Sequence, residues 1–173
     1  MVFVKVLISE TSRHALEGNP FQIHFFYGEP DTQLAPGDYF KAPNLIGTYR
    51  TFTSPMSSHD QKSRRTSSNN LSTGQISLSP LLANAVFNGI LPDTSLAPES
   101  VVPKLSDNLE WRITDSSGQK EVPVQDLADK GQLRVSVVSR DVEPILAGEE
   151  HLFPRYGEWV EHEDVTKGKV GGV

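Results

Sequence analysis

Hydrophobic and polar side chains alternate along five separate stretches of the chain. The hydrophobic positions are rich in valine, isoleucine, phenylalanine and tyrosine, and a period of two in such residues is typical of a strand with one buried face. The pattern therefore predicts strands at residues 2–8, 21–27, 45–53, 109–114 and 133–138.

The segments between these strands hold the residues that interrupt regular structure. Residues 28–44 contain three prolines and two glycines, which predicts a long irregular connection. Residues 54–70 contain six serines and predict a long, mobile Ser-rich loop. Ser79 and Pro80, followed by an apolar run that ends at Gly89, have the N-cap, first-turn proline and terminating glycine of one short helix.

Together these elements predict an all-β fold, an antiparallel β-sandwich with one short helix and the Ser-rich loop. A length of 173 residues suits a single domain with one hydrophobic core. We expect the sandwich to span residues 1–160. Charges dominate the sequence that follows, so residues 161–173 are expected to form a fraying tail.

Charge and cysteine content narrow the possible partners. The chain has 16 Lys and Arg residues against 22 Asp and Glu residues, a formal net charge of −6, so we expect no nucleic acid partner. With no cysteine, a disulfide, a thiolate metal site and a cysteine nucleophile are all excluded. No stretch reaches about 18 apolar residues and no signal peptide is recognisable, so we expect a cytoplasmic protein with no membrane partner.

Five motifs follow one another in the order found in a known family. They are residues 21–29 (FQIHFFYGE), 43–48 (PNLIGT), 77–82 (SLSPLL), 109–113 (LEWRI) and 156–159 (YGEW). In this order they resemble the C-terminal domain of fungal tyrosinases and related polyphenol oxidases. The similarity spans nearly the whole chain.

The resemblance implies a β-sandwich, related to the equivalent hemocyanin domain, that lies over the copper site of a separate catalytic domain and keeps the enzyme latent. In some fungal members an aromatic side chain of this domain occupies the substrate pocket, and Phe52 fits that position. The family also has a Cys-x-x-Cys pair linked to copper handling. Here a polar loop around His59 stands in its place, so a role in copper delivery loses its support.

The histidines are too few for tyrosinase chemistry. A coupled dicopper centre needs about six histidines arranged on helices, whereas this chain has five that are widely scattered. Tyrosinase activity is therefore excluded for these residues, and no cofactor and no metal site are expected. The acidic run at residues 161–164 is interpreted as a surface segment, because adjacent residues of an extended chain point to opposite sides.

Five residues are candidates to line a pocket or face a partner: His24, Tyr27, Tyr49, Arg50 and Phe52. His24 lies on the strand face opposite the aromatic row that contains Tyr27, which suits either a surface histidine or one hydrogen-bonded in a shallow pocket. Phe52 is either an anchor for a partner or ligand, or a rim residue at a strand end. The sequence identifies no catalytic residue among them.

The neighbouring strand allows two interpretations as well. Trp111 is in phase with Leu109 and Ile113, which predicts a core position. Glu110 and Arg112 face the other way, either as a cross-strand pair on a solvated face or as hydrogen-bonding groups for a carbonyl substrate.

Two functions fit these observations. Met1 coincides with the start of the first strand, which suggests a self-contained product and favours a protein that binds or acts on an apolar small molecule. Such a protein could be a cofactor-free cyclase or isomerase in fungal secondary metabolism. The alternative is a non-catalytic shielding subunit that covers the copper site of a separate tyrosinase-like oxidase. An enclosed cavity would favour the cyclase, and an exposed apolar patch would favour the shield.

Overall fold

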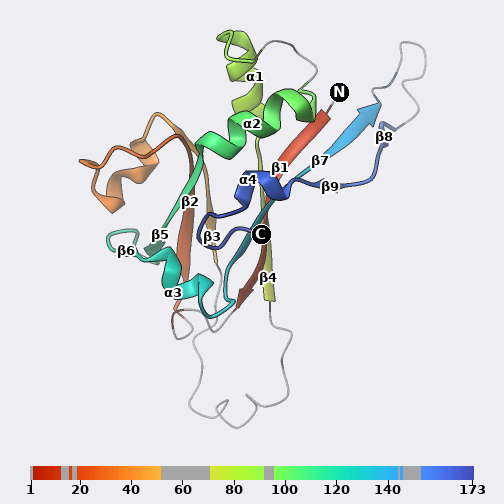
Figure 1. The fold of residues 1–173 in the computed structure, drawn as a ribbon. Coiled ribbons are helices and arrows are strands. Elements are labelled where there is room, and N and C mark those ends of the chain that lie inside the picture. The colour runs from red at the N-terminus through yellow and green to blue at the C-terminus, as the bar shows by residue number, and fades with distance from the viewer. Residues whose placement is uncertain are drawn as a thin grey trace.

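Two antiparallel sheets form the framework of the chain (Figure 1). The computed structural model describes residues 2–12, 16, 19–51, 71–91, 96–143, 145 and 153–173. The first sheet has the order β4-β1-β7-β8, and β9 also pairs with β7. Its strands are β1 Val2–Ser12, β4 Leu71–Ser77, β7 Arg134–Glu143, β8 Arg155–Tyr156 and β9 Val160–Glu161.

The second sheet has the order β3-β2-β5-β6. Its strands are β2 Phe21–Tyr27, β3 Leu45–Arg50, β5 Leu109–Asp115 and β6 Glu121–Val122. The five predicted strands are confirmed as β1, β2, β3, β5 and β7, although β1 and β7 extend further than the pattern indicated. Residues 52–53 of the third predicted strand and the predicted Ser-rich loop at 54–70 lie outside the described residues.

One hydrophobic core lies between the two sheets. From the first sheet it takes alternate residues of β1, such as Val6, and the opposite residue of β7, Val137. From the second it takes Phe25 and Trp111, which lie opposite each other on β2 and β5. The period-two pattern therefore selects the core face correctly, and each such large buried side chain contributes about 1.5–3 kcal/mol.

The expectation of an all-β fold with one helix is only partly right, because the chain is mainly β with several short helices. The predicted helix is α1, Ser79–Phe87. The others are α2 Pro98–Asn108, α3 Val124–Ala128, α4 Glu163–Thr166 and the 3-10 helix η2 Pro36–Lys41. None of the helices in the described part of the chain is long and apolar enough to span a membrane.

Helix α2 was missed because Pro103 lies inside it. An internal proline removes a backbone hydrogen bond and normally disfavours a helix. Here Val101 and Leu105 are buried in the core on one side of the helix. Tertiary packing therefore outweighs the local preference.

The C-terminal segment, which its charges suggested would fray, packs against the domain. Val165 of α4 is fully buried, and the indole Nε1 of Trp111 donates to the carbonyl of Val170 at 3.0 Å. The backbone N–H of Val135 donates to the carbonyl of Gly171 at 2.8 Å, beside a bridge between Val135 and Gly172. The apolar residues among the charges thus hold this segment on β5 and β7.

Candidate functional site

The outer face of the second sheet carries several polar side chains that could bind a ligand. Because Phe25 faces the core, its neighbours His24 and Phe26 point to the opposite side. Residues 30–41, which end in η2, cross this outer side. Phe26 packs there with Tyr39 and Ala42 in a small second cluster of buried residues.

Tyr39 of η2 is the centre of this face. It is buried, and its ring lies edge-on to both His24 and Phe26, with ring centroids 5.4 Å apart in each case. Its hydroxyl donates to the Oε2 of Glu121 on β6 at 2.9 Å. Burial and this carboxylate raise the pKa of Tyr39 to about 12, so the phenol stays protonated at neutral pH.

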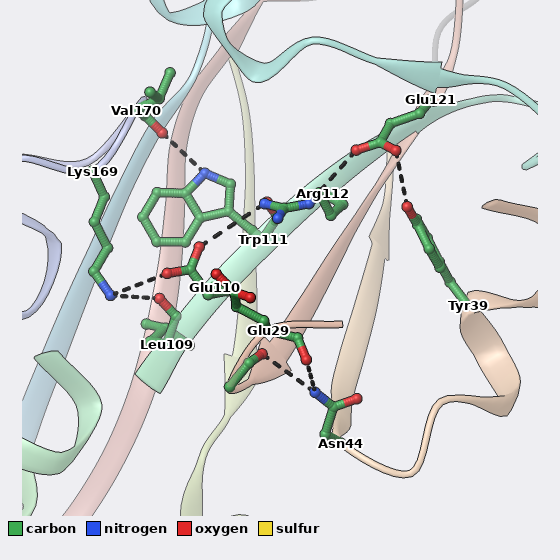
Figure 2. A network of polar contacts seen from close by, with 11 residues as sticks. Glu29, Tyr39, Asn44, Leu109, Glu110, Trp111, Arg112, Glu121, Lys169 and Val170 are labelled. Carbon is green, nitrogen blue, oxygen red and sulfur yellow. Dashed lines mark hydrogen bonds and ion pairs between the residues drawn. The ribbon is translucent and has the colours of Figure 1, made fainter. Parts of the chain in front are cut away.

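A line of alternating charges continues from Glu121 across β5 (Figure 2). The Nε of Arg112 lies 3.6 Å from Glu121, and its Nη1 lies 3.9 Å from Glu110. The Nζ of Lys169 lies 4.0 Å from Glu110 and donates to the carbonyl of Leu109 at 2.6 Å. Each cation thus has a carboxylate beside it. Glu110 and Arg112, predicted as a cross-strand pair, do pair, but along β5, which holds both of them. The ion pair that crosses strands joins Arg112 to Glu121 on β6.

Two hollows flank Tyr39 and η2. The larger, of about 470 Å³, is lined by residues 30–36 together with Tyr39, Arg112 and Glu121. The smaller, of about 260 Å³, is lined by His24, Arg50 and Phe40 among others. Both contain hydrogen-bonding groups next to an aromatic ring, so either could hold a small polar ligand.

His24, on the floor of the smaller hollow, is only 5% exposed. Its Nδ1 lies 3.0 Å from the hydroxyl of Thr48, and its Nε2 lies 2.9 Å from the hydroxyl of Thr114. Burial first, and the nearby Arg50 second, lower the pKa of His24 to about 4. The ring is therefore neutral at neutral pH, with both nitrogens in hydrogen bonds, and it is a weak candidate for a general base.

The structure separates the predicted site residues. His24 and Arg50 meet at the smaller hollow. Tyr27 and Tyr49 lie on the other face of the same sheet and pack against the main core. The Tyr49 ring covers Gly74 of β4 so closely that a Cβ there would overlap it. Phe52, the candidate anchor, lies outside the described residues.

Sequence reasoning missed Tyr39 and Glu121. The hydrogen bond between them joins residues 82 positions apart, and the connection that carries Tyr39 has no periodicity to indicate its direction. The available signal was the aromatic pair Tyr39 and Phe40 within a Pro- and Gly-rich stretch. An aromatic residue in such a stretch often packs on the nearest sheet.

The comparisons with known proteins identify the family. Residues 7–137 match the family model described as the tyrosinase C-terminal domain. The chain belongs to this family. This confirms the resemblance seen in the motifs.

Similar proteins are longer than this domain. A tyrosinase of Neurospora crassa is 28% identical over 164 residues, which are 92% of this chain and 22% of the relative. The structure of recombinant mushroom tyrosinase matches with a TM-score of 0.61 and 17% identity, covering 95% of this chain and 25% of that one. A holo-protyrosinase of Aspergillus oryzae matches with a TM-score of 0.49 and 17% identity over 93% of this chain and 21% of that one. The chain thus spans about a fifth to a quarter of these proteins.

The described residues of this tyrosinase C-terminal domain do not fit a copper site. Among them, no three His, Cys, Asp or Glu side chains are placed to hold a metal ion. Both nitrogens of His24 are already in hydrogen bonds, and the Nε2 of His162 lies 2.7 Å from the hydroxyl of Ser139. These two histidines are structural, because their ring nitrogens are engaged with hydroxyl groups of the domain.

Proposed function

We propose that this domain is a non-catalytic covering domain that docks on the copper-containing catalytic part of a tyrosinase-type oxidase. The observation that carries the proposal is the family match over residues 7–137, within relatives of which the domain makes up about a quarter or less. A domain that recurs as one part of longer tyrosinases is expected to act through contact with the rest of such a protein.

The chemistry of the outer face of the second sheet agrees with a non-catalytic role. His24 is neutral and fully hydrogen-bonded, and Tyr39 holds its proton against Glu121. Arg112 lies between two carboxylates, so its charge is already compensated. Because these groups are engaged with one another, a covering role that depends on shape and surface contact suits them better than proton transfer does.

A second candidate function is the binding of a small molecule by a metal-free cyclase or isomerase. The observation that favours it is the smaller hollow, where His24 and Arg50 meet. Tyr27 and Tyr49, two of the expected pocket walls, lie on the opposite face of the sheet and cannot line that hollow. The direct test is incubation with candidate apolar precursors without added metal. Unchanged product ratios would count against this function.

The covering function is tested with a tyrosinase from which the matching segment has been removed. Neurospora crassa tyrosinase, trimmed by proteolysis of the part that this chain matches, is mixed with the purified domain. Binding is measured by interferometry, and catechol oxidation is followed in parallel. We expect a dissociation constant of about micromolar order, typical of an interface between separate domains, and a fall in the oxidation rate as the domain is added.

Untrimmed tyrosinase is the control, because its own segment already occupies the docking surface. The domain should then neither bind nor slow oxidation. Trimmed enzyme that oxidises catechol at the same rate in a large molar excess of the domain, with no binding signal, would refute the covering function.

A further inference from the structure

The outer face of the first sheet has a different character from the site described above. Here β7 lies between β1 on one side and β8 and β9 on the other (Figure 1). Phe3 lies opposite Arg140 in the β1–β7 ladder, and Lys5 lies two residues further along β1. Tyr156 pairs with Val142, two residues from Arg140, and so shares its side of the sheet.

Two cations and two aromatic rings meet on this surface, called here the cation–aromatic face and defined as Lys5, Arg140, Tyr156 and Trp159. The guanidinium carbon of Arg140 lies 4.0 Å from the Tyr156 ring centroid and 4.3 Å from that of Trp159. The Nζ of Lys5 lies 3.8 Å from the centroid of the Trp159 ring. Phe3 supports that ring edge-on, at 6.2 Å between centroids.

Among the described residues, the guanidinium of Arg140 has no hydrogen-bond acceptor. Its Nε is buried and has no hydrogen-bond partner. No ion pair or hydrogen bond joins its guanidinium to another residue in the described part of the chain. The contacts to the rings satisfy its cationic charge in part, but a buried N–H without an acceptor is costly.

Lys5 adds a second positive charge close by. Its Nζ donates to the side-chain oxygen of Gln75 at 2.8 Å, and no carboxylate lies within ion-pair distance of it among the described residues. Burial lowers the pKa of Lys5, and the charge of Arg140 lowers it further. The nearest acid in the register is Glu161, which pairs with Val138, one strand away from Lys5. Two neighbouring cations therefore have no carboxylate within ion-pair distance in the part of the chain that the structure describes.

We propose that the cation–aromatic face binds a carboxylate from an acidic segment of a partner protein. One carboxylate would accept hydrogen bonds from the terminal Nη groups of Arg140 and lie beside the ammonium of Lys5, which compensates both charges. This inference is independent of the covering function, because it rests on a different sheet and on local charge alone.

The surroundings favour a protein segment over a free ion. Tyr156 is 55% exposed and Trp159 is 38% exposed. A free anion makes no use of such apolar surface, whereas a peptide with an apolar residue next to its carboxylate covers part of it. The chain as a whole carries a net charge of −6, so a local positive site also sets where an acidic partner can approach.

The test uses a fluorescein-labelled hexaglutamate peptide as the probe and the whole chain as the protein. Binding is followed by anisotropy at low salt and by tryptophan fluorescence. Trp159 is 38% exposed, whereas Trp111, the other tryptophan, is buried. Trp159 should therefore report the binding. We expect Arg140→Gln to weaken binding about tenfold and Lys5→Gln by about threefold to tenfold. Arg140→Lys should fall between wild type and Arg140→Gln.

Arg155→Gln is the matched control. It removes the same charge from β8, but Arg155 lies next to Tyr156 and so points to the other side of the strand. It should bind the peptide as the wild type does. Thermal unfolding of every variant checks that it is folded. If Arg140→Gln does not fold, the loss of peptide binding in Lys5→Gln tests the proposal instead.

Three results would overturn the inference. Equal losses of binding in Arg140→Gln and Arg155→Gln would mean that only net charge matters. Acetate and inorganic phosphate are added as competitors at a concentration of anionic groups equal to that of the peptide carboxylates. If either displaces the peptide, the site binds small anions rather than a protein segment. A hexaglutamine peptide should not bind, and binding equal to that of hexaglutamate would also overturn the inference.

Discussion

The outer faces of the two sheets differ in whether their cationic side chains have carboxylates beside them. On the second sheet, Arg112 lies between Glu110 and Glu121, and residues 30–41 cover the strands beneath. On the first sheet, Lys5 and Arg140 lie side by side against aromatic rings, with no carboxylate of the described residues within ion-pair distance. A face whose charges compensate one another stabilises the fold, while a face with uncompensated charge is suited to a partner.

The largest effect is expected from Tyr39, which links the covering segment to the second sheet. Tyr39→Ala removes a buried ring from contact with His24 and Phe26 and should lower the free energy of unfolding by about 3 kcal/mol. Tyr39→Phe loses only the hydrogen bond to Glu121, about 1 kcal/mol. Urea unfolding measures both. Phe40→Ala, at a neighbouring residue that is 67% exposed, is the control and should change stability little.

A loss in Tyr39→Ala no larger than in Phe40→Ala would show that the covering segment is not held by this ring. The contrast between a covered and an open face would then fail.

The next effect is the pH dependence of stability that His24 causes. The pKa of His24 is lowered from 6.5 to about 4 in the folded state. Above pH 6.5 the ring is neutral in both states. As the pH falls from 6.5 to 4, the unfolded chain takes up a proton that the folded chain does not, and stability is lost. Between pH 7 and pH 4.5, wild type should lose about 2 kcal/mol more than His24→Gln in urea unfolding.

His162→Gln provides the comparison, since burial also lowers the pKa of His162, although that side chain has fewer buried partners. His162→Gln should reduce the pH dependence of the free energy of unfolding less than His24→Gln does. Parallel pH profiles for wild type and His24→Gln would contradict the neutral, buried state of His24.

A smaller effect is expected on the first sheet from Trp159. Trp159→Ala removes the ring that Phe3 supports and that both cations contact. Because the ring is partly exposed, we expect a loss of about 1–2 kcal/mol in thermal unfolding. Trp159→Phe should recover more than half of that loss. A loss as large as that of Tyr39→Ala would mean that this face is a structural core rather than a surface.

The smallest expected effect is a difference between the two faces in how salt changes the stability lost when an arginine is removed. Removing Arg112 in Arg112→Gln breaks exposed ion pairs worth about 0.5 kcal/mol, and this loss should shrink in high salt. Arg140 has a like charge beside it instead, so screening removes a repulsion. The loss in Arg140→Gln should therefore stay equal or grow by a few tenths of a kcal/mol in high salt. Equal salt dependence in the two variants would remove the distinction between the faces.

Much of the fold was predictable because it depends on local pattern. The alternation in β1, β2 and β5 identifies both the strands and the face that each buries. Helix α2 was not predictable, because its two core residues outweigh Pro103 only through contacts with distant segments. The candidate site was half predictable. His24 and Arg50 share a face by period two, but the same rule places Tyr49 on the other side.

The sequence alone is enough to assign five strands, β1, β2, β3, β5 and β7, with the faces that they bury, the family, and the shortage of histidine and cysteine ligands. The short or less regular strands β4, β6, β8 and β9 were not predicted. The sequence also did not determine which outer side chains meet. Tyr39 contacts Glu121, and Arg140 contacts Trp159, only because the path of the connecting segments and the register of the sheets place them together. The alternation along a strand indicates to which side of the sheet each residue points. Which residues become its neighbours depends on strand order and register, and these are decided by the packing of the whole core.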